Sequence, residues 1–353
     1  MSLSFSLNEQ VLVTANRFLV DAAGQRGPEC ESLIENQHLG WFIVANCQGH
    51  ILYSTPGAVD VATFFRSSAK PFQALPLVNR GFYRELTVQE LALTCASHVA
   101  SAEHLQIAAG LLQKAGLSEA ALQCGPHAPL DAQMSARLLQ TGEVPTALFN
   151  NCSGKHAGML YYCFRAGEDP STYLEPSHPL QVEIRQQIRY WGGVSSDLPL
   201  AIDGCGAPIA YLPLLSMARL YAHLGSSAEF LPLRQAMTQY PVLVGGIGRV
   251  DTTLMQITEG RLLAKVGADG VLCVARVNQQ EGLALKLADG TTDVRDLALV
   301  QLLLRLGWLS EREASDPRLK PFLEKKQRRN TQGKTVGEYQ LHLPSPQHAV
   351  SVD

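Results

Sequence analysis

The sequence has few charged residues and no run of one charge sign. Only 17 % of its 353 residues are Asp, Glu, Lys or Arg, and the formal net charge is −3. Nowhere do Lys and Arg form a block or a stripe interleaved with aromatic residues, which is the usual footprint of a nucleic-acid-binding protein. We therefore expect no nucleic-acid partner.

Long apolar runs are also absent. No stretch of about 18 uncharged apolar residues, the length that spans a membrane, occurs in the chain. The N-terminal segment lacks the basic and then apolar regions of a secretory signal. We therefore expect a cytoplasmic protein with no membrane partner.

The composition favours one compact unit. Hydrophobic residues make up 46 % of the chain, and no Pro/Ser/Gly-rich linker interrupts it. We expect a single domain over residues 1–353 with two intimate lobes. The sheet lobe is predicted from about residues 8–85 and 245–353, and the helical lobe from about residues 86–244.

The eight cysteines do not resemble a disulfide framework. A chain of this length without an export signal usually keeps free thiols. Cys95 and Cys163 lie in apolar runs and are predicted to be core residues. Cys152 and Cys205 differ, because each lies in a polar cluster that contains glycine.

Strand patterns are found at both chain ends and helical patterns between them. Two hairpins are predicted at residues 41–54 and 261–277, with a further strand at residues 282–290. Helices are predicted at residues 87–96, 101–116, 131–142, 178–193, 207–225 and 296–309. The predicted fold is α+β: an antiparallel sheet built from N- and C-terminal strands, with flanking helices and an inserted helical lobe.

The segment RSSAKP at residues 66–71 can be read as a nucleophile with its base. Pro71 is tolerated only in the first turn of a helix, so the helix is predicted to begin at about Ser67 or Ser68. Ser67 and Lys70 would then share one face. A desolvated lysine there could take the serine proton. The alternative is an N-cap serine followed by a solvated lysine.

A second lysine and a second serine extend this hypothesis. Lys265 lies two residues before Gly267 at the end of a predicted strand, like the Lys-Thr-Gly element of penicillin-binding proteins, although Val266 takes the middle place. It could equally be an ordinary strand lysine. Ser97 follows a predicted helix, where it could either offer a hydroxyl to the same site or only cap a helix.

Two polar clusters could bind a metal or an anion. NNCSGKHAGM contains Cys152 and Lys155, and AIDGCGAP contains Asp203 and Cys205. Thiolates suit zinc, although lysine is a rare ligand. Lys155 with the loop amides could instead hold a substrate carboxylate. The third reading is two buried thiols and a surface lysine.

These motifs together resemble one family. RSSAKPFQALP, ASH followed by EH, CGPHAP, NNCSGKHAGM, HPLQ, DGCGAP, GRVDT and KVGADG occur in this order. They resemble the bacterial L-asparaginase II family (Rhizobium etli-type, class 3 asparaginases) from about residue 9 to about residue 305. The resemblance implies a fold similar to serine β-lactamases and glutaminases, and it suggests a homodimer.

The resemblance also implies site residues. Two serine and lysine pairs are implied as catalytic: Ser67 with Lys70, and Ser97 with Lys265, for which Lys286 is the competitor. Zinc is implied as cofactor, with ligands Cys152, Lys155 and Cys205. We assign substrate binding to Arg66, His98 and Asp203. The chain departs from the family pattern after His98, where Ala100 and Ser101 replace a Gly-Glu pair, and in NQHLG, which keeps only His38 and Gly40 of an earlier element.

The activity implied is hydrolysis of the side-chain amide of L-asparagine to L-aspartate and ammonia through an acyl-enzyme. One alternative is an enzyme of the same fold that acts on glutamine or a β-lactam. The other is a zinc-containing protein that binds amino acids without hydrolysing them.

Overall fold

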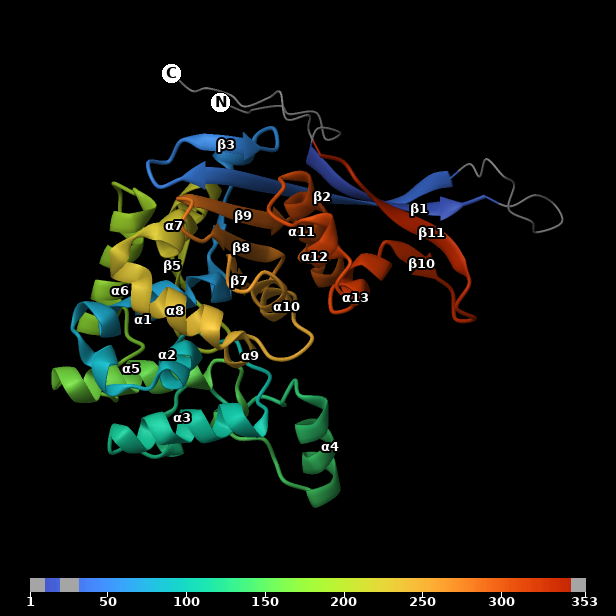
Figure 1. Cartoon of the computed structure of the whole chain (residues 1–353). Coiled ribbons are helices and arrows are strands. Elements are labelled where there is room, and N and C mark those ends of the chain that lie inside the picture. Colours follow the sequence, from blue (N-terminus) through green and yellow to red (C-terminus); the bar gives the residue numbers. More distant parts are fainter. Residues whose placement is uncertain (1–9, 20–31, 344–353) are drawn as a thin grey trace.

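The computed structural model describes residues 10–19 and 32–343. Its main feature is an eight-stranded antiparallel sheet in the order β10-β11-β1-β2-β9-β8-β7, with β3 paired to β2 (Figure 1). The strands are β1 Val11–Phe18, β2 Ser32–Asn46, β3 Ile51–Ser54, β7 Leu262–Val266, β8 Val271–Arg276, β9 Glu281–Leu287, β10 Gln327–Arg329 and β11 Thr335–Leu341. Cys30 and the first residues of the predicted sheet lobe lie outside the described residues.

The sheet joins the two ends of the chain. β9 inserts between β2 and β8, and its pairing with β2 runs from Gly40 opposite Leu287 to Asn46 opposite Glu281. Both predicted hairpins are present, as β2–β3 and β7–β8. The predicted α+β fold, with an antiparallel sheet from N- and C-terminal strands and a helical central region, is therefore confirmed.

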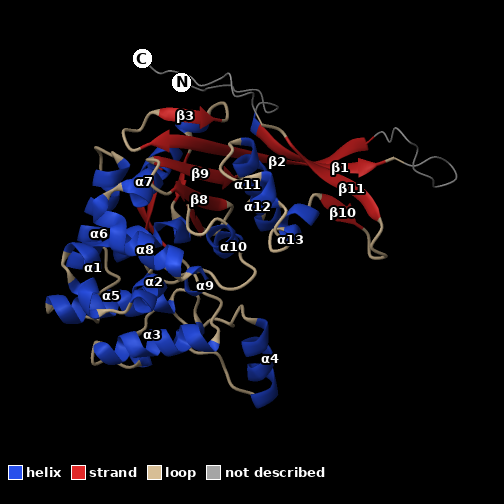
Figure 2. Cartoon of the chain, viewed as in Figure 1, coloured by secondary structure: helices blue, strands red, loops and turns tan. Residues whose placement is uncertain are grey.

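Side chains on the two faces of the central strands pack into two separate hydrophobic cores. Because side chains alternate along a strand, Leu272 and Val274 pack on one face with α10 Val250–Ile257 and α11 Thr292–Arg305. Cys273 and Ala275 pack on the other face in the cluster that contains α7 Leu214–Ser226. Figure 2 shows this layering of helices on both sides of the sheet.

The central region is mostly helical, as the sequence predicted. Its helices are α1 Lys70–Asn79, α2 Val88–Thr94, α3 Ala102–Lys114, α4 Ala132–Thr141, α5 Ser153–Ala166, α6 Pro179–Gly192, α8 Leu231–Gln239 and α9 Pro241–Val244. Two short helices, α12 Glu311–Ala314 and α13 Lys320–Glu324, follow α11. Within the described residues, no helix has the length and apolar character needed to cross a membrane.

The prediction of one helix over residues 207–225 is wrong in its first half. Residues Pro208–Pro213 form strand β6, which pairs with β4 Ala62–Phe64 and β5 Leu200–Ile202 in a second, three-stranded sheet. The helix α7 starts only after Pro213, since a proline inside a helix removes a backbone donor. Pairing with two distant strands outweighs the helical pattern of this segment.

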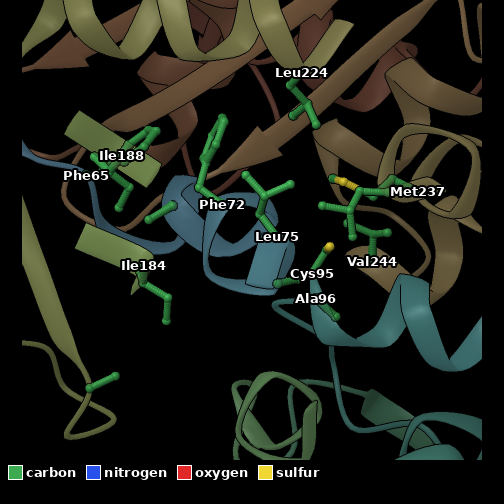
Figure 3. Packing of buried hydrophobic residues seen from close by; sticks show 14 of the residues in the cluster. Phe65, Phe72, Leu75, Cys95, Ala96, Ile184, Ile188, Leu224, Met237 and Val244 are labelled. Atoms are coloured by element: carbon green, nitrogen blue, oxygen red, sulfur yellow. The ribbon is translucent and has the colours of Figure 1, made fainter. Parts of the chain in front are cut away.

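Aromatic packing fixes the start of α1. Phe65 and Phe72 are fully buried and stacked, with ring centroids 5.5 Å apart. Phe72 also contacts Tyr221 of α7 edge-on at 5.7 Å. Figure 3 shows Phe65, Phe72 and Leu75 pointing into this cluster from the α1 region. The turn that carries Arg66, Ser67 and Ser68 is therefore anchored on a rigid aromatic base.

Gly282 of β9 lies directly against the backbone of α7. A Cβ added there would lie 2.1 Å from Ala218 O and 2.4 Å from Ala222 N, which are backbone atoms of α7. We expect Gly282→Ala to lower the free energy of unfolding by about 3 kcal/mol, since a packed core resists added volume. Urea denaturation followed by circular dichroism measures the change.

Gly110 of α3 is the matched control. A Cβ there meets nothing within 4 Å. Gly110→Ala should therefore raise the free energy of unfolding by roughly 0.5–1 kcal/mol through helix propensity. Equal stability of the two variants would contradict the close packing of β9 on α7.

Candidate active site

The two adjacent serines of RSSAKP have different environments. They lie in a 3₁₀ turn, Arg66–Ala69, that leads into α1. Ser68 is fully buried, and its hydroxyl donates a hydrogen bond of 3.0 Å to the Lys265 carbonyl. Ser67 is partly exposed, and within the described residues its hydroxyl makes no hydrogen bond. Neither serine side chain caps the turn or α1.

Lys70 is a buried lysine that faces Ser97. Its side chain is 1 % exposed, and Nζ donates to Ser97 Oγ at 2.9 Å and to the Ala96 carbonyl at 2.6 Å. Nζ also lies 3.2 Å from Cys152 Sγ. The structure records no hydrogen bond between Lys70 and Ser67 in the part of the chain that it describes. Lys70 therefore connects the start of α1 to Ser97 and to the thiol cluster.

Lys265 reaches the same serine from β7. It is completely buried, and its Nζ donates to Ser97 Oγ at 2.9 Å and to the Val266 carbonyl at 3.0 Å. Burial lowers the pKa of Lys265 to about 7, against the opposing pull of the Asp251 carboxylate. Lys286, the competing lysine, instead donates to the Asp269 carbonyl. The structure thus brings Lys265, and not Lys286, to Ser97.

Ser97 lies where α2 ends and is held by its backbone. Its N–H donates to the Val244 carbonyl at 2.9 Å, and the residue is 3 % exposed. A hydroxyl oxygen accepts two hydrogen bonds and donates one. With a lysine on each side, Ser97 is placed to pass a proton to whichever amine is neutral. The Ser97 hydroxyl, in the segment between α2 and α3, therefore points toward the two buried lysines.

Arg66 has an unusual backbone and two carboxylate partners. Its φ is 51°, a left-handed conformation that costs a residue with a side chain about 1–3 kcal/mol. Its guanidinium lies 3.3 Å from Asp203 and 3.3 Å from Asp269. Arg66 and Asp203 are partly exposed, so this charged group and Ser67 lie at the accessible edge of the buried lysines.

His98 is a buried residue next to Ser97 that links this segment to α5. It is completely buried, with Nε2 3.0 Å from Ser153 Oγ and Nδ1 accepting from the Ala100 N–H at 3.1 Å. Burial holds the pKa of His98 well below its usual range. In the described residues, no hydrogen bond joins His98 to Arg66 or Ser67. The ring instead ties the Ser97 segment to the start of α5.

The predicted zinc ligands lie together beside Lys70. Lys155 Nζ is 3.0 Å from Cys205 Sγ, which in turn is 3.8 Å from a carboxylate oxygen of Asp203. The interaction with Cys205, followed by the nearby lysine charges, holds the pKa of Cys152 well below its usual range despite burial. Burial opposes the charge on Lys155, but the two thiols outweigh it and raise its pKa.

The chemistry of this cluster suits a soft or borderline metal. Two thiols and an amine are donors that zinc accepts. His156 adds a ring whose Nδ1 contacts Tyr173 Oη at 2.7 Å and whose buried Nε2 has no hydrogen-bond partner among the described residues. Burial, then the Lys155 charge, lowers the pKa of His156 to about 4, so the ring is neutral. The residues present therefore fit a zinc ion.

A second group could also hold a metal and was not predicted from the sequence. Among the described residues, ligand atoms of Cys163, Glu168 and His178 lie within 4.8 Å of one another. His178 already has other partners, because its Nδ1 accepts from the Leu180 N–H and its Nε2 lies 3.2 Å from the Asp169 carbonyl. This histidine caps α6, so metal binding would disrupt a helix start.

Asp251 is a site residue that the sequence reading missed. It is completely buried in the first turn of α10, and a carboxylate oxygen lies 3.7 Å from Lys265 Nζ. The motif GRVDT contains it, but an acidic residue in a first helical turn usually only complements the helix dipole. The signal in the sequence that could have indicated a buried carboxylate was the position of Asp251 next to apolar helix residues.

Fold and comparison together give the class of the protein. A mixed α+β architecture with buried lysines at a serine hydroxyl suits acyl-transfer chemistry on amides, and the chain is an amidohydrolase. It belongs to the L-asparaginase II family, whose model matches residues 29–341. The family resemblance is thereby confirmed, and the family implies L-asparaginase activity. No curated protein sequence matches the chain significantly.

The contrast between the two serines can be tested by stability. Ser68→Ala removes the buried hydroxyl that donates to the Lys265 carbonyl, and we expect it to lower the free energy of unfolding by about 1 kcal/mol. Ser67→Ala should change it by less than about 0.5 kcal/mol, since that side chain is partly exposed. Denaturant titration of both variants measures the difference. The reverse order would contradict the orientation of the turn.

Proposed function

We propose that the protein hydrolyses the side-chain amide of L-asparagine to L-aspartate and ammonia through an acyl-enzyme on Ser67. The observation that carries this proposal is the pair of buried lysines, Lys70 and Lys265, that donate to one hydroxyl at Ser97. Lysine side chains are rarely fully buried unless they are paired or take part in function. Membership in the L-asparaginase II family supplies the substrate.

Of the three serine hydroxyls near the buried lysines, that of Ser67 is the most accessible and therefore the best candidate nucleophile. Ser68 is occupied and buried, whereas the Ser67 side chain is partly exposed at the accessible edge. Ser97 is 3 % exposed and is bracketed by amines, which suits a proton relay.

The steps then balance as an acyl transfer. Ser67 Oγ bonds to the side-chain carbonyl carbon of asparagine, and its proton passes to a neutral Lys70, which Ser97 links to Lys265 as a proton relay. Backbone N–H groups at the start of the helical turn stabilise the oxyanion. The carbon–nitrogen bond breaks as the lysine returns the proton to the leaving nitrogen, which departs as ammonia. Water, deprotonated by the same route, attacks the ester and releases aspartate.

The charged edge of the site suits an amino-acid zwitterion. Arg66 offers a guanidinium to the substrate α-carboxylate, and Asp203 offers a carboxylate to the α-ammonium group. The two residues lie 3.3 Å apart, so one zwitterion can satisfy both. His98 contributes by bracing the Ser97 segment. Asparagine and glutamine share the zwitterion, and the distance from it to the nucleophile would select between them.

Zinc would be held by Cys152, Lys155 and Cys205. When bound, it would order the substrate rather than activate water, because two thiolates make the ion electron-rich. The lysine Nζ must then release its proton, which the adjacent thiols otherwise keep in place. Homodimer formation and a cytoplasmic location remain predictions.

Removal of Ser67 or Lys70 tests the catalytic proposal. We expect Ser67→Ala and Lys70→Met each to lower kcat for ammonia release from asparagine by about 10³-fold or more, since a nucleophile and its proton relay act as one unit. Coupled detection of ammonia measures the rate, with glutamine and nitrocefin assayed beside asparagine. Ser310→Ala, on the exposed cap of α12, is the control and should keep full activity.

Trapping the intermediate identifies the acylated residue. Acid quenching during turnover, followed by peptide mass spectrometry, should find the aspartyl ester on the peptide with Ser67. An ester on Ser97, or normal turnover by Ser67→Ala, would refute the assignment. Binding of asparagine by calorimetry with no ammonia release would favour an amino-acid-binding protein instead.

Metal analysis separates the two candidate metal groups. We expect zinc in protein purified without added metal, and we expect a Cys152→Ser, Cys205→Ser double variant to lose it because both thiolates are removed. His178→Asn, which changes the other group, should retain it. Elemental analysis by mass spectrometry measures the zinc content. Retention by the double variant together with loss in His178→Asn would move the site to Cys163, Glu168 and His178.

A further inference from the structure

Asp251 is a fully buried carboxylate directed at the end of β7. One oxygen accepts from the Val266 N–H at 3.0 Å and lies 3.7 Å from Lys265 Nζ. The other oxygen accepts from the Thr252 N–H at 3.1 Å. The same carboxylate therefore contacts both the backbone and the side chain of the strand that delivers Lys265 to Ser97.

The surrounding backbone leaves room for this carboxylate. A Cβ at Gly245 would lie 2.9 Å from Asp251 Oδ1 and 2.5 Å from Thr252 Oγ1. The Thr252 hydroxyl is itself fixed on the Pro241 carbonyl at 3.1 Å. Gly245 thus leaves space beside Asp251 Oδ1, and the backbone N–H of Thr252 holds that oxygen. An isolated buried carboxylate would be very unfavourable, so its partner is Lys265.

Four titratable groups influence Lys265 most. Burial disfavours its ammonium most, Lys70 and Arg249 add repulsion, and Asp251 is the largest opposing influence, ahead of the Cys152 thiol. Asp251 is the one of these groups in the described part of the chain that forms an ion pair with Lys265. Without it, Lys265 would face Lys70 across Ser97 with no ion-pair partner among the described residues.

We propose that Asp251 is a positioning residue of the active site, which holds the Lys265 side chain against Ser97 and favours its ammonium form. This inference rests on the proposed function, because it gives Lys265 a part in proton transfer. A general base works best when its pKa lies close to the working pH. Asp251 keeps Lys265 near that range, although burial and Lys70 act to lower its pKa further.

The test removes the charge and keeps the shape. In Asp251→Asn, we expect Lys265 to titrate about 1 to 3 pH units lower, the usual effect of losing an opposite charge at this range. Two-dimensional NMR of ¹³C,¹⁵N-labelled lysine side chains measures the titration, with the Lys265 signal identified by its loss in Lys265→Met. This readout needs no turnover, so it stands even if asparagine is not the substrate.

The pH profile gives the second readout. A base must be neutral to accept a proton, so a lower pKa of Lys265 moves the acid limb of kcat/KM to lower pH, by the same shift that NMR records. Asp251→Glu keeps the charge and should return the limb toward that of the unmodified protein. Glu90→Gln in α2, which removes another buried carboxylate, one that pairs with Lys114, is the matched control and should leave the Lys265 titration unchanged.

Each outcome decides the inference. An unchanged Lys265 titration in folded Asp251→Asn, or an activity loss with the acid limb in place, would overturn it. If Asp251→Asn does not fold, the Asp251→Asn, Lys265→Met double variant removes the unpaired charge as well. Folding of the double variant supports the pairing, and failure to fold when Lys265→Met alone folds refutes it.

Discussion

The site depends on the hydroxyl oxygen of Ser97, where two buried ammonium-forming side chains meet. Lys70 and Lys265 each lie 2.9 Å from that oxygen. Charges of one sign this close repel each other strongly where water is excluded. Two neighbouring groups offset this repulsion: the Cys152 thiol lies beside Lys70, and the Asp251 carboxylate lies beside Lys265. The thiol cluster and helix α10 therefore both stabilise the pair of lysines at Ser97.

Much of the fold could be predicted because its signals are local. Alternating apolar residues and short turns marked the β2–β3 and β7–β8 hairpins, and apolar residues at helical spacing marked the helices. Strand β6 was missed, since nothing within residues 208–213 states that two distant strands will pair with them. The order of the sheet, with β9 between β2 and β8, is likewise a property of contacts far apart in the sequence.

The site was predicted in part for the same reason. Ser-x-x-Lys spacing identified Ser67 and Lys70, but it implied that their side chains share a face, whereas Lys70 extends to Ser97. The segment before Lys70 is a 3₁₀ turn that begins with Arg66 in a left-handed backbone conformation, and neither feature follows from helical periodicity. Asp251 was overlooked because its partner Lys265 arrives from another element. Motifs name residue types, while only the folded chain shows which charges face each other.

The place of β9 also orders events during synthesis. Because β2 emerges early and its neighbour β9 is made only after the whole helical region, one long edge of β2 stays unpaired on the ribosome for most of translation. Pairings between distant segments form slowly, and exposed edges attract other chains. Lys265 reaches Ser97 from β7, in the hairpin that directly precedes β9 in the chain. The pairing of β9 with β2 and the arrival of Lys265 at Ser97 both wait for residues 262–287, so a nascent chain that ends before them carries no assembled catalytic centre.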